Sequence, residues 1–436
     1  MNFEMSPKAQ RMSRRVLDFM ENYVLRTLPV WRREVEQGQA HPQCMEDLKQ
    51  LAQAEGLWNL FLPSLDTHEP EQRLTNLEYA PLAEIMGRVH WASEAFNCSA
   101  PDSGNMELLQ MFATQEQRER WLAPLLDGTI RSCFAMSEPD VASSDATNIQ
   151  LSIRRDGDEY VINGRKWFIS GAAHPLCKFA IVMGVTDPNA ATYRRQSMVI
   201  VPFDTPGLTI VRDIPVMNHH FPGGHCEMLL RDVRVPCANL IHEEGAGFAI
   251  AQARLGPGRI HHCMRSIGQA ELALELMCER AAERRTFGHY LHQHGTVAEW
   301  IALSRMEIEQ ARLLVLKTAW MIDQHGAKGA AREIAMIKAI VPRMQTTICD
   351  RAMQVFGAMG LSPDTPLAEL WTWGRVLRIA DGPDEVHVRS VARLEMAAAS
   401  ERRGSDAAIY VGSAGVGRMK RFVRLCFFLV DQAPSA

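Results

Sequence analysis

Three acids lie close together in the stretch RVLRIADGPDEVHVR, which begins at residue 375. Asp381 precedes a Gly-Pro pair, and Asp384 and Glu385 follow it. A buried carboxylate can act as a general base when its pKa suits the working pH. Acids just before a helix also satisfy its free backbone N–H groups, so each of the three could instead be a cap. The local sequence leaves both interpretations open.

The bulk composition is that of a globular protein with more than one core. The chain has 436 residues, of which 47% are hydrophobic and 22% charged, and its formal net charge is −4. A chain of this length predicts two or three packed domains. The negative charge supplies no basic field for phosphate backbones, which argues against nucleic acid as the main partner.

Three further features bear on where the protein works. Its ten cysteines are scattered, with no CxxC pair, which predicts reduced thiols, a cytoplasmic location and no structural metal. The opening residues alternate like an amphipathic helix, so no signal peptide is expected. No run of about eighteen apolar residues occurs, so no membrane span is expected.

The hydrophobic periodicity changes along the chain. Residues 1–128 repeat apolar side chains every three or four positions, which predicts an N-terminal helical domain. Residues 129–240 switch to short period-two segments bounded by turn residues. These predict a middle domain of antiparallel strands, closed as a barrel or stacked as a sandwich. Long helical patterns return over 241–400 and predict a C-terminal four-helix bundle.

This order of helices, strands and helices defines an α+β fold. It contains no alternation of single strands with single helices, which excludes a doubly wound nucleotide fold. Residues 401–436 form an atypical basic and apolar tail. We expect the tail to pack on this subunit or on a neighbour, with contact to a membrane surface as the alternative.

Four stretches together resemble a known family. They are CFAMSEPDVASSDATNI (133–149), YVINGRKWFISG (160–171), ERRTFGHYL (283–291), and QVFGAMG (354–360) followed by RIADGPDEVH (378–387). In this order and spacing they resemble the acyl-CoA dehydrogenases, which are flavoenzymes, and among these the subgroup related to the animal ten- and eleven-type enzymes. Each stretch alone is a weak signal, but four in order over about 250 residues agree independently.

The resemblance implies oxidation of an acyl-CoA thioester between Cα and Cβ to a trans-2-enoyl-CoA. A base must remove the Cα proton, and a cofactor must take the hydride from Cβ because no amino acid accepts one. The family uses FAD, which an electron-transfer flavoprotein reoxidises. Its members work in fatty acid metabolism as homodimers or homotetramers.

The resemblance also assigns residues to the flavin. Phe134, Met136 and Ser137 would line the ring. Phe168 would stand where the family has a Trp beside the flavin, and Ser170 would bond its N5 edge. Taken without the resemblance, the same residues form a turn-rich loop and a core strand.

A second set would reach the FAD of a neighbouring subunit and therefore implies an oligomer. Arg284 and Phe287 match residues at the pyrophosphate and adenine, since a guanidinium forks onto a diphosphate. Gln354 and Gly357 match residues that meet the partner's FAD, where a small residue lets the backbone approach. The alternative for the segment that contains Arg284 is a solvated charge cluster at the end of a helix. Glu385 is a further candidate for a cofactor hydrogen bond.

The family places its base at one of two positions. Most members have a Glu just before the Gly of the RIADGPDEV region, where this chain has Asp381. Other members keep the base immediately before the CoA-binding arginine, which is Arg259 here, and that position is Gly258. The resemblance therefore points to Asp381 as the base and gives its backbone N–H a second role at the thioester carbonyl. Gly382 and Ser144 are the other expected substrate contacts.

An aspartate base differs from a glutamate base in reach. The carboxylate of Asp381 sits closer to its own backbone by roughly 1.5 Å, so the backbone or the substrate must advance. Burial beside the flavin and the acyl chain is expected to raise its pKa. His261 and His262 also titrate near neutrality, but we expect them to pack or to cap a helix. Asp384 and Glu385 are expected mainly as helix-start residues.

Two other functions stay open. Oxidases and flavin monooxygenases of the same fold pass electrons to oxygen, and oxygen access depends on the shape of the cavity, which the sequence does not give. A flavin-binding relative without catalysis is the third possibility. The net charge of −4 and the carboxylate at position 381 speak against it.

Overall fold

The computed structural model describes residues 4–62 and 72–404. The chain divides into two units, residues 1–388 and 389–436. All the predicted site residues lie in the first unit. The tail predicted over 401–436 lies outside the described residues from position 405 onward.

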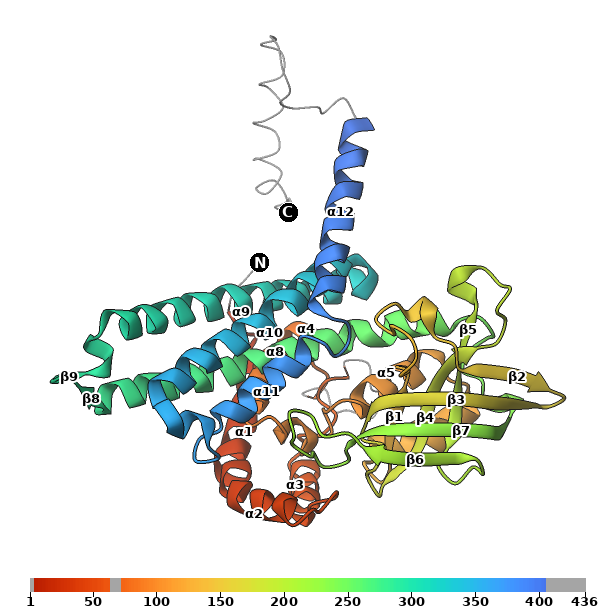
Figure 1. Cartoon of the computed structure of the whole chain (residues 1–436), viewed down its shortest axis with the longest axis horizontal. Helices are drawn as coiled ribbons and strands as arrows, with labels where there is room; N and C mark the ends of the chain where they lie inside the picture. Colours follow the sequence, from red (N-terminus) through yellow and green to blue (C-terminus); the bar gives the residue numbers. More distant parts are fainter. Residues whose placement is uncertain (1–3, 63–71, 405–436) are drawn as a thin grey trace, which may run out of the picture. The chain divides into compact units, whose positions relative to one another are not determined.

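The N-terminal region is built from helices (Figure 1). They are α1 (Pro7–Phe19), η1 (Met20–Val24), α2 (Leu25–Glu36), α3 (Gln43–Ala54), α4 (Asn76–Gly87), η2 (Ala92–Glu94), α5 (Asp102–Phe112), α6 (Gln115–Gln117), η3 (Arg118–Leu122) and α7 (Ala123–Leu126). The helix predicted at the start is confirmed. Ser6 caps it by accepting a hydrogen bond from the Ala9 N–H, and Met12, Val16 and Phe19 are buried at helical spacing.

The middle region forms a seven-stranded sheet within the described residues. Its strands are β1 (Arg131–Ala135), β2 (Ser152–Asp156), β3 (Glu159–Ser170), β4 (Cys177–Val185), β5 (Gln196–Pro202), β6 (Leu208–Asp213) and β7 (His225–Pro236). The strand order is β1-β4-β2-β3-β7-β6, with β5 paired to β4. Strand β3 is antiparallel to β2 and β7, whereas β1 and β2 run parallel to β4. Period-two patterning marks a strand but does not fix the direction of its partner.

Long helices return after the sheet. The elements are α8 (Gly247–Glu283), the hairpin β8 (Arg285–Thr286) and β9 (His289–Tyr290), α9 (Gly295–Gly329), α10 (Ala331–Phe356), α11 (Leu367–Leu377) and α12 (Asp384–Gly404). Helices α8, α9 and α10 pack against one another (Figure 1). The predicted α+β class, with helices, then a β region, then helices, is confirmed. In the part of the chain that the structure describes, no helix is both long and apolar enough to cross a membrane.

Two glycines let helices α4 and α8 cross at close range. A Cβ on Gly268 of α8 would overlap the carbonyl oxygen of Glu84, and a Cβ on Gly87 of α4 would overlap that of Arg265. Backbone atoms cannot turn aside as a flexible side chain can, so only glycine fits at both positions. The crossing fixes the part of α8 that carries Arg265.

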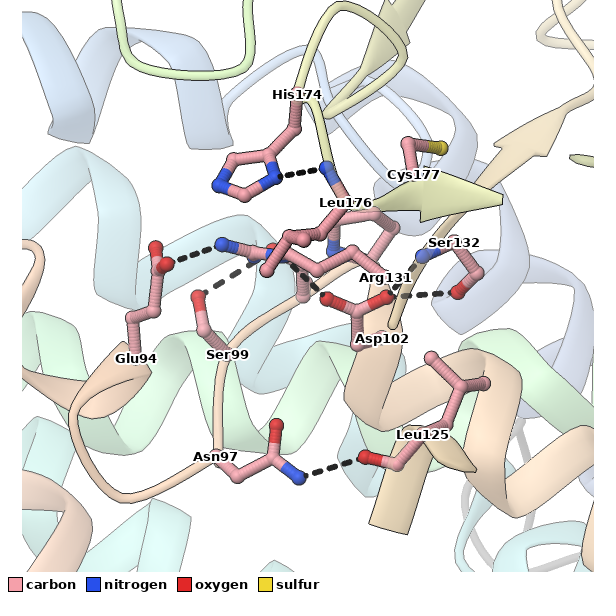
Figure 2. A network of polar contacts seen from close by, with 12 residues as sticks. Glu94, Asn97, Ser99, Asp102, Leu125, Arg131, Ser132, His174, Leu176 and Cys177 are labelled. Carbon is pink, nitrogen blue, oxygen red and sulfur yellow. Dashed lines mark hydrogen bonds and ion pairs between the residues drawn. The ribbon is translucent and has the colours of Figure 1, made fainter. Parts of the chain in front are cut away.

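A buried polar network joins strand β1 to helix α5 (Figure 2). Asp102 accepts hydrogen bonds of 2.7 Å from both the N–H and the hydroxyl of Ser132, and one of 2.9 Å from Arg131 Nε. Arg131 also pairs with Glu94. Because the arginine meets two carboxylates, its charge is compensated although it is largely buried. The network fixes the start of β1, which carries Phe134.

A histidine pair lies beside this network. His41 Nδ1 and His174 Nε2 are 3.1 Å apart, and His174 Nδ1 accepts a hydrogen bond from the Leu176 N–H (Figure 2). A ring nitrogen that accepts carries no proton, so His174 is the neutral tautomer with its proton on Nε2. Burial, followed by the charge of nearby Arg131, lowers the pKa of His174 to about 3.

We expect Gly268→Ala to destabilise the fold, because the new methyl group would overlap the backbone of α4. The expected loss is about 3 kcal/mol in the free energy of unfolding, measured by urea denaturation. Gly295→Ala is the matched control: it lies at the start of α9, and a Cβ there meets no atom within 4 Å. Alanine also has the higher helix propensity, so this control should be as stable as the parent or slightly more so. Equal losses in the two variants would contradict the close crossing.

Acid should destabilise the fold through His174. Its pKa in the folded state lies below the ordinary value of 6.5, so the unfolded chain takes up a proton first as the pH falls. The contribution of His174 to the free energy of unfolding is fully present above about pH 6.5 and decreases as the pH falls toward 3. At pH 5 the loss is about 2 kcal/mol. In His174→Gln the urea midpoint should therefore fall less between about pH 7 and pH 5 than in the parent. Replacement of the exposed His219 by Gln is the control, and equal falls in parent and His174→Gln would refute the assignment.

Candidate active site

The connection between α11 and α12 holds Asp381 in a strained conformation. Asp381 and Gly382 both have positive φ, 55° and 100°. A residue other than glycine in this region costs about 1 kcal/mol or more and persists only where its surroundings fix it. Here the Asp381 carbonyl accepts a hydrogen bond of 3.0 Å from Arg259 Nε and lies 3.3 Å from His387 Nε2.

Helices α10 and α12 hold the two ends of the same connection. Lys338 of α10 donates to the Leu377 carbonyl and lies 3.4 Å from the Gly382 carbonyl. Asp384 begins α12 and pairs with Arg378 Nε at 2.8 Å. Its predicted place at a helix start is therefore confirmed. Glu385 follows in the first turn and is exposed, and its cofactor contact stays a prediction.

The Asp381 carboxylate faces helix α8. Its Oδ2 lies 3.3 Å from His262 Nε2, and a Cβ on Gly258 would lie 3.8 Å from the same oxygen. The two positions expected for a base, 381 and 258, therefore face each other, and the carboxylate at 381 occupies the space between them. The contact that the structure gives the Asp381 side chain is with His262 of α8, and its role as a base rather than a helix cap stays a prediction.

The electrostatic surroundings keep Asp381 ionised. Burial alone would raise its pKa, but the hydrogen bond from His262 and the charges of Arg254 and Lys338 outweigh burial, and the pKa lies well below its usual range. The raised pKa expected beside flavin and acyl chain stays a prediction, and the cations of the chain itself act in the opposite direction. The carboxylate is therefore free of its proton near neutral pH, as a proton acceptor must be.

A stripe of four residues on α8 faces this site. Arg254, Gly258, His262 and Arg265 recur at spacings of four, four and three, which places them on one side of the helix. Arg254 lies over the ring of Phe134, 4.0 Å from its centroid. Arg254 and Arg265 are not among the predicted site residues, although their helical spacing from Gly258 was a signal that could have found them.

The two adjacent histidines of α8 have different surroundings. His261 is 1% exposed and packs between the rings of Phe61 and Tyr79, at centroid distances of 5.8 and 5.3 Å. The packing expected of it is confirmed. His262, one residue further along the helix, contacts Asp381, so the expectation that it packs or caps is wrong.

The loop after β1 runs beside the end of β3. Lys166 Nζ donates to the Met136 carbonyl at 2.8 Å, and the Trp167 N–H donates to the Ser137 carbonyl at 3.1 Å. Phe168 follows with a φ of 50° and leaves 47% of its surface exposed. The structure thus brings Met136, Ser137 and Phe168 close together. The ring of Phe168 is exposed, and its backbone has a positive φ.

Ser170 ends strand β3 beside a histidine. Its Oγ lies 2.9 Å from His225 Nδ1, while His225 Nε2 is buried and has no hydrogen-bond partner among the described residues. A buried ring nitrogen without a partner marks a place where another polar group can bind. Ser144 is exposed on the loop between β1 and β2, and no described contact joins it to Asp381.

A second group of predicted cofactor residues lies at the far end of the bundle. It consists of Arg284, Phe287, Gln354 and Gly357. Arg284 follows Gly258 by about 26 residues, which is roughly 39 Å along helix α8. The ends of α8 and α10 meet there, with Arg280 over the ring of Phe356 at 5.4 Å. All four residues are exposed, and Phe287 exposes 93% of its surface. The structure does not bring this group to Asp381 within one subunit.

Three family models match nearly the whole chain. Residues 6–129 match the N-terminal domain of acyl-CoA dehydrogenases, 133–233 the middle domain and 245–396 the C-terminal domain. The chain therefore belongs to the acyl-CoA dehydrogenase family. The limits at 128, 240 and 400 that the sequence suggests for the domains stay a prediction.

Named relatives agree with the predicted subgroup. The Mycobacterium tuberculosis protein called probable acyl-CoA dehydrogenase FadE2 is 56% identical over 401 residues, which are 91% of this chain and 97% of the relative. Acyl-CoA dehydrogenase family member 11 of Gallus gallus is 52% identical, and member 10 of Mus musculus is 53% identical, each over 90% of this chain. The chain spans only 51% and 37% of these two animal proteins.

Solved structures share the fold. One from Mycobacterium abscessus, described as an acyl-CoA dehydrogenase, is 48% identical with a TM-score of 0.87, covering 91% of this chain and 100% of that chain. The butyryl-CoA dehydrogenase of Megasphaera elsdenii has the same coverage, with 26% identity and a TM-score of 0.78. An FAD complex of PigA, at 22% identity and a TM-score of 0.78 over 91% of this chain and 99% of that one, is alike in fold alone.

Proposed function

We propose that this chain catalyses the FAD-dependent conversion of an acyl-CoA thioester to its trans-2-enoyl-CoA, with Asp381 as the base. Family membership supports acyl-CoA dehydrogenation in general. The observation that carries the choice of residue is the Asp381 carboxylate, which lies against Gly258 of α8 at the point where both expected base positions meet. The ionised state of that carboxylate suits proton removal.

The residues around Asp381 divide the remaining tasks. Arg259 fixes the Asp381 carbonyl through Nε, and its terminal nitrogens would meet the CoA part of the substrate. The backbone N–H of Asp381 would then donate to the thioester carbonyl and stabilise the charge that forms as the Cα proton leaves. Gly382 and Ser144 complete the proposed substrate contacts. The positive φ of Gly382 shapes the backbone beside that donor.

The residues near β1 and β3 fit a flavin. Phe134, Met136, Ser137, Phe168 and Ser170 would hold the ring system. An exposed aromatic side chain and a hydroxyl beside an unpartnered imidazole nitrogen are the apolar wall and the polar edge that a flavin needs. FAD, when bound, supplies the acceptor for the hydride from Cβ.

The distant second group supports a homo-oligomer. Arg284, Phe287, Gln354 and Gly357 are exposed and far from Asp381, so we assign them to the cofactor of a neighbouring subunit in a homodimer or homotetramer. Glu385 is proposed as a further cofactor contact. An electron-transfer flavoprotein as electron acceptor, a role in fatty acid metabolism and a cytoplasmic location complete the proposal.

The first test is a visible spectrum followed by anaerobic titration with acyl-CoAs of different chain length. We expect a flavin band at about 450 nm that one class of acyl-CoA bleaches. Bleached enzyme that stays reduced in air until an electron-transfer flavoprotein is added supports the dehydrogenase. Recolouring in air within seconds would instead assign the chain to the oxidases or monooxygenases. A flavin that no acyl-CoA bleaches would refute the proposed reaction.

Asp381→Asn should keep the flavin band but lose proton removal. The amide has nearly the shape of the carboxylate and cannot accept the Cα proton at neutral pH, so turnover should fall by about 10²- to 10⁴-fold. Asp364→Asn, which changes an exposed carboxylate between η8 and α11, is the control and should turn over like the parent. Normal turnover in Asp381→Asn would refute the base assignment and leave the flavin assignment intact.

A further inference from the structure

We propose that His262 is a positioning residue for Asp381, and that Arg265 holds His262 in the tautomer that donates a hydrogen bond to the carboxylate. The inference rests on the proposed role of Asp381 as the base. It adds two residues that lie outside the four motifs of the sequence.

Helix geometry places both residues at the base. His262 lies four residues after Gly258, and Arg265 three residues after His262, so all three share one face of α8. His262 Nε2 and a Cβ at position 258 approach the same carboxylate oxygen, Oδ2 of Asp381, at 3.3 and 3.8 Å. The imidazole therefore contacts the base from one turn further along the helix.

Arg265 decides which ring nitrogen carries the proton. Its Nη2 lies 3.1 Å from His262 Nδ1. A guanidinium only donates hydrogen bonds and keeps its charge in proteins, so Nδ1 must accept and be unprotonated. The remaining proton of a neutral imidazole is then on Nε2, which donates it to Asp381 Oδ2. Donation thus runs in one direction, from Arg265 to His262 and from His262 to the accepting carboxylate of Asp381.

Arg265 is itself fixed on two sides. Its Nη1 donates to the carbonyl of Cys98 at 3.3 Å, and its side chain is largely buried. Its own backbone carbonyl lies at the close crossing of α8 with Gly87 of α4. The donor that sets the tautomer therefore sits where α8 crosses α4 at close range, and a rigid support is what an oriented site requires.

The surrounding groups favour a neutral imidazole. The groups that carry charge or titrate around His262 and Asp381 include Arg254, Arg259, His261, Cys263 and Arg265 of α8, Lys338 of α10 and His387 of α12. The carboxylates of Glu107 and Asp384 act on Arg254 and Lys338, and the cations nearest to His262 oppose a further positive charge on it. Burial, followed by the effects of Arg265 and Lys338, lowers the pKa of His262 against the opposing effect of Asp381.

Holding one carboxylate oxygen leaves the other for the substrate. The described residues give Oδ1 of Asp381 no hydrogen-bond partner, whereas Oδ2 has the imidazole. Rotation of the carboxylate is restricted when one oxygen is bound, so Oδ1 keeps one direction. In the proposed step the Cα–H bond breaks, its electron pair stays on the acyl group, and the proton passes to Oδ1.

The test separates proton removal from hydride transfer. The probe is an acyl-CoA with sulfur in place of Cβ, whose α-proton is acidic and whose sulfur has no hydride to give. Its deprotonation beside the flavin is followed by absorbance as a function of pH, together with kcat and KM for the best acyl-CoA. Flavin content and the urea midpoint of each variant are measured first.

His262→Leu should lower kcat by about 10- to 100-fold with KM within about twofold of the parent. Loss of the donor raises the pKa of Asp381, so probe deprotonation should require a higher pH than in the parent. His262→Gln places a donor at nearly the same distance and should restore most of kcat and the original pH dependence. In His262→Asn the side chain is too short to reach Oδ2, so this variant should behave like His262→Leu. If His262→Leu does not fold, the comparison of the Gln and Asn variants tests the inference instead.

Arg265→Met removes one of the cations that oppose a proton on His262, so probe deprotonation should gain a second ionisation that the parent lacks over the same pH range. In an Asp381→Asn background, His262→Leu should cause no further loss, because the imidazole acts through the carboxylate. Parent values of kcat and pH dependence in His262→Leu, or equal behaviour of the Gln and Asn variants, would overturn the inference. A parent chain whose flavin no acyl-CoA bleaches would instead overturn the proposed function.

Discussion

The hydrogen bond from Arg259 to the carbonyl of Asp381 is the contact on which the site depends. Asp381 adopts a left-handed backbone conformation that an aspartate does not favour by itself. Arg259 from α8 and Lys338 from α10 hold the carbonyls of this connection, so the strain is supported by two helices of the bundle. The same conformation turns the carboxylate toward α8. If the bundle did not pack, the connection between α11 and α12 would relax and Asp381 would become an ordinary acid near a helix start.

Charge around the carboxylate is arranged to keep it ionised rather than to make it strongly basic. Arg254 and Lys338 lower its pKa, and His262 donates to it. In the proposed reaction the free energy for proton removal must then come from stabilising the charge that forms on the thioester, where the backbone N–H of Asp381 would act. The architecture therefore divides the work between a fixed acceptor and donors directed at the developing charge.

The support of the site extends into all three regions of the first unit. The Asp102 network fixes the start of β1 and so the place of Phe134, over which Arg254 of α8 lies. The glycine crossing fixes α8 against α4 at the level of Arg265. Helices and sheet are thus joined by buried polar contacts as well as by apolar packing. Such contacts specify one arrangement, because a buried donor or acceptor without its partner is costly.

The sequence by itself determined the order of helices and strands, the family, and the candidate base at Asp381, because periodicity, turn residues and local motifs are all written within short segments. It did not determine that β1 and β2 run parallel to β4, nor that His262 contacts the base while His261 packs in the core. Helical spacing placed His262 on the face of Gly258, but only the packing of α8 against the α11–α12 connection decided what that face meets. The lowered pKa of Asp381 was likewise decided by tertiary structure, since its cations come from distant positions in the chain and Coulomb interactions depend on distance in space.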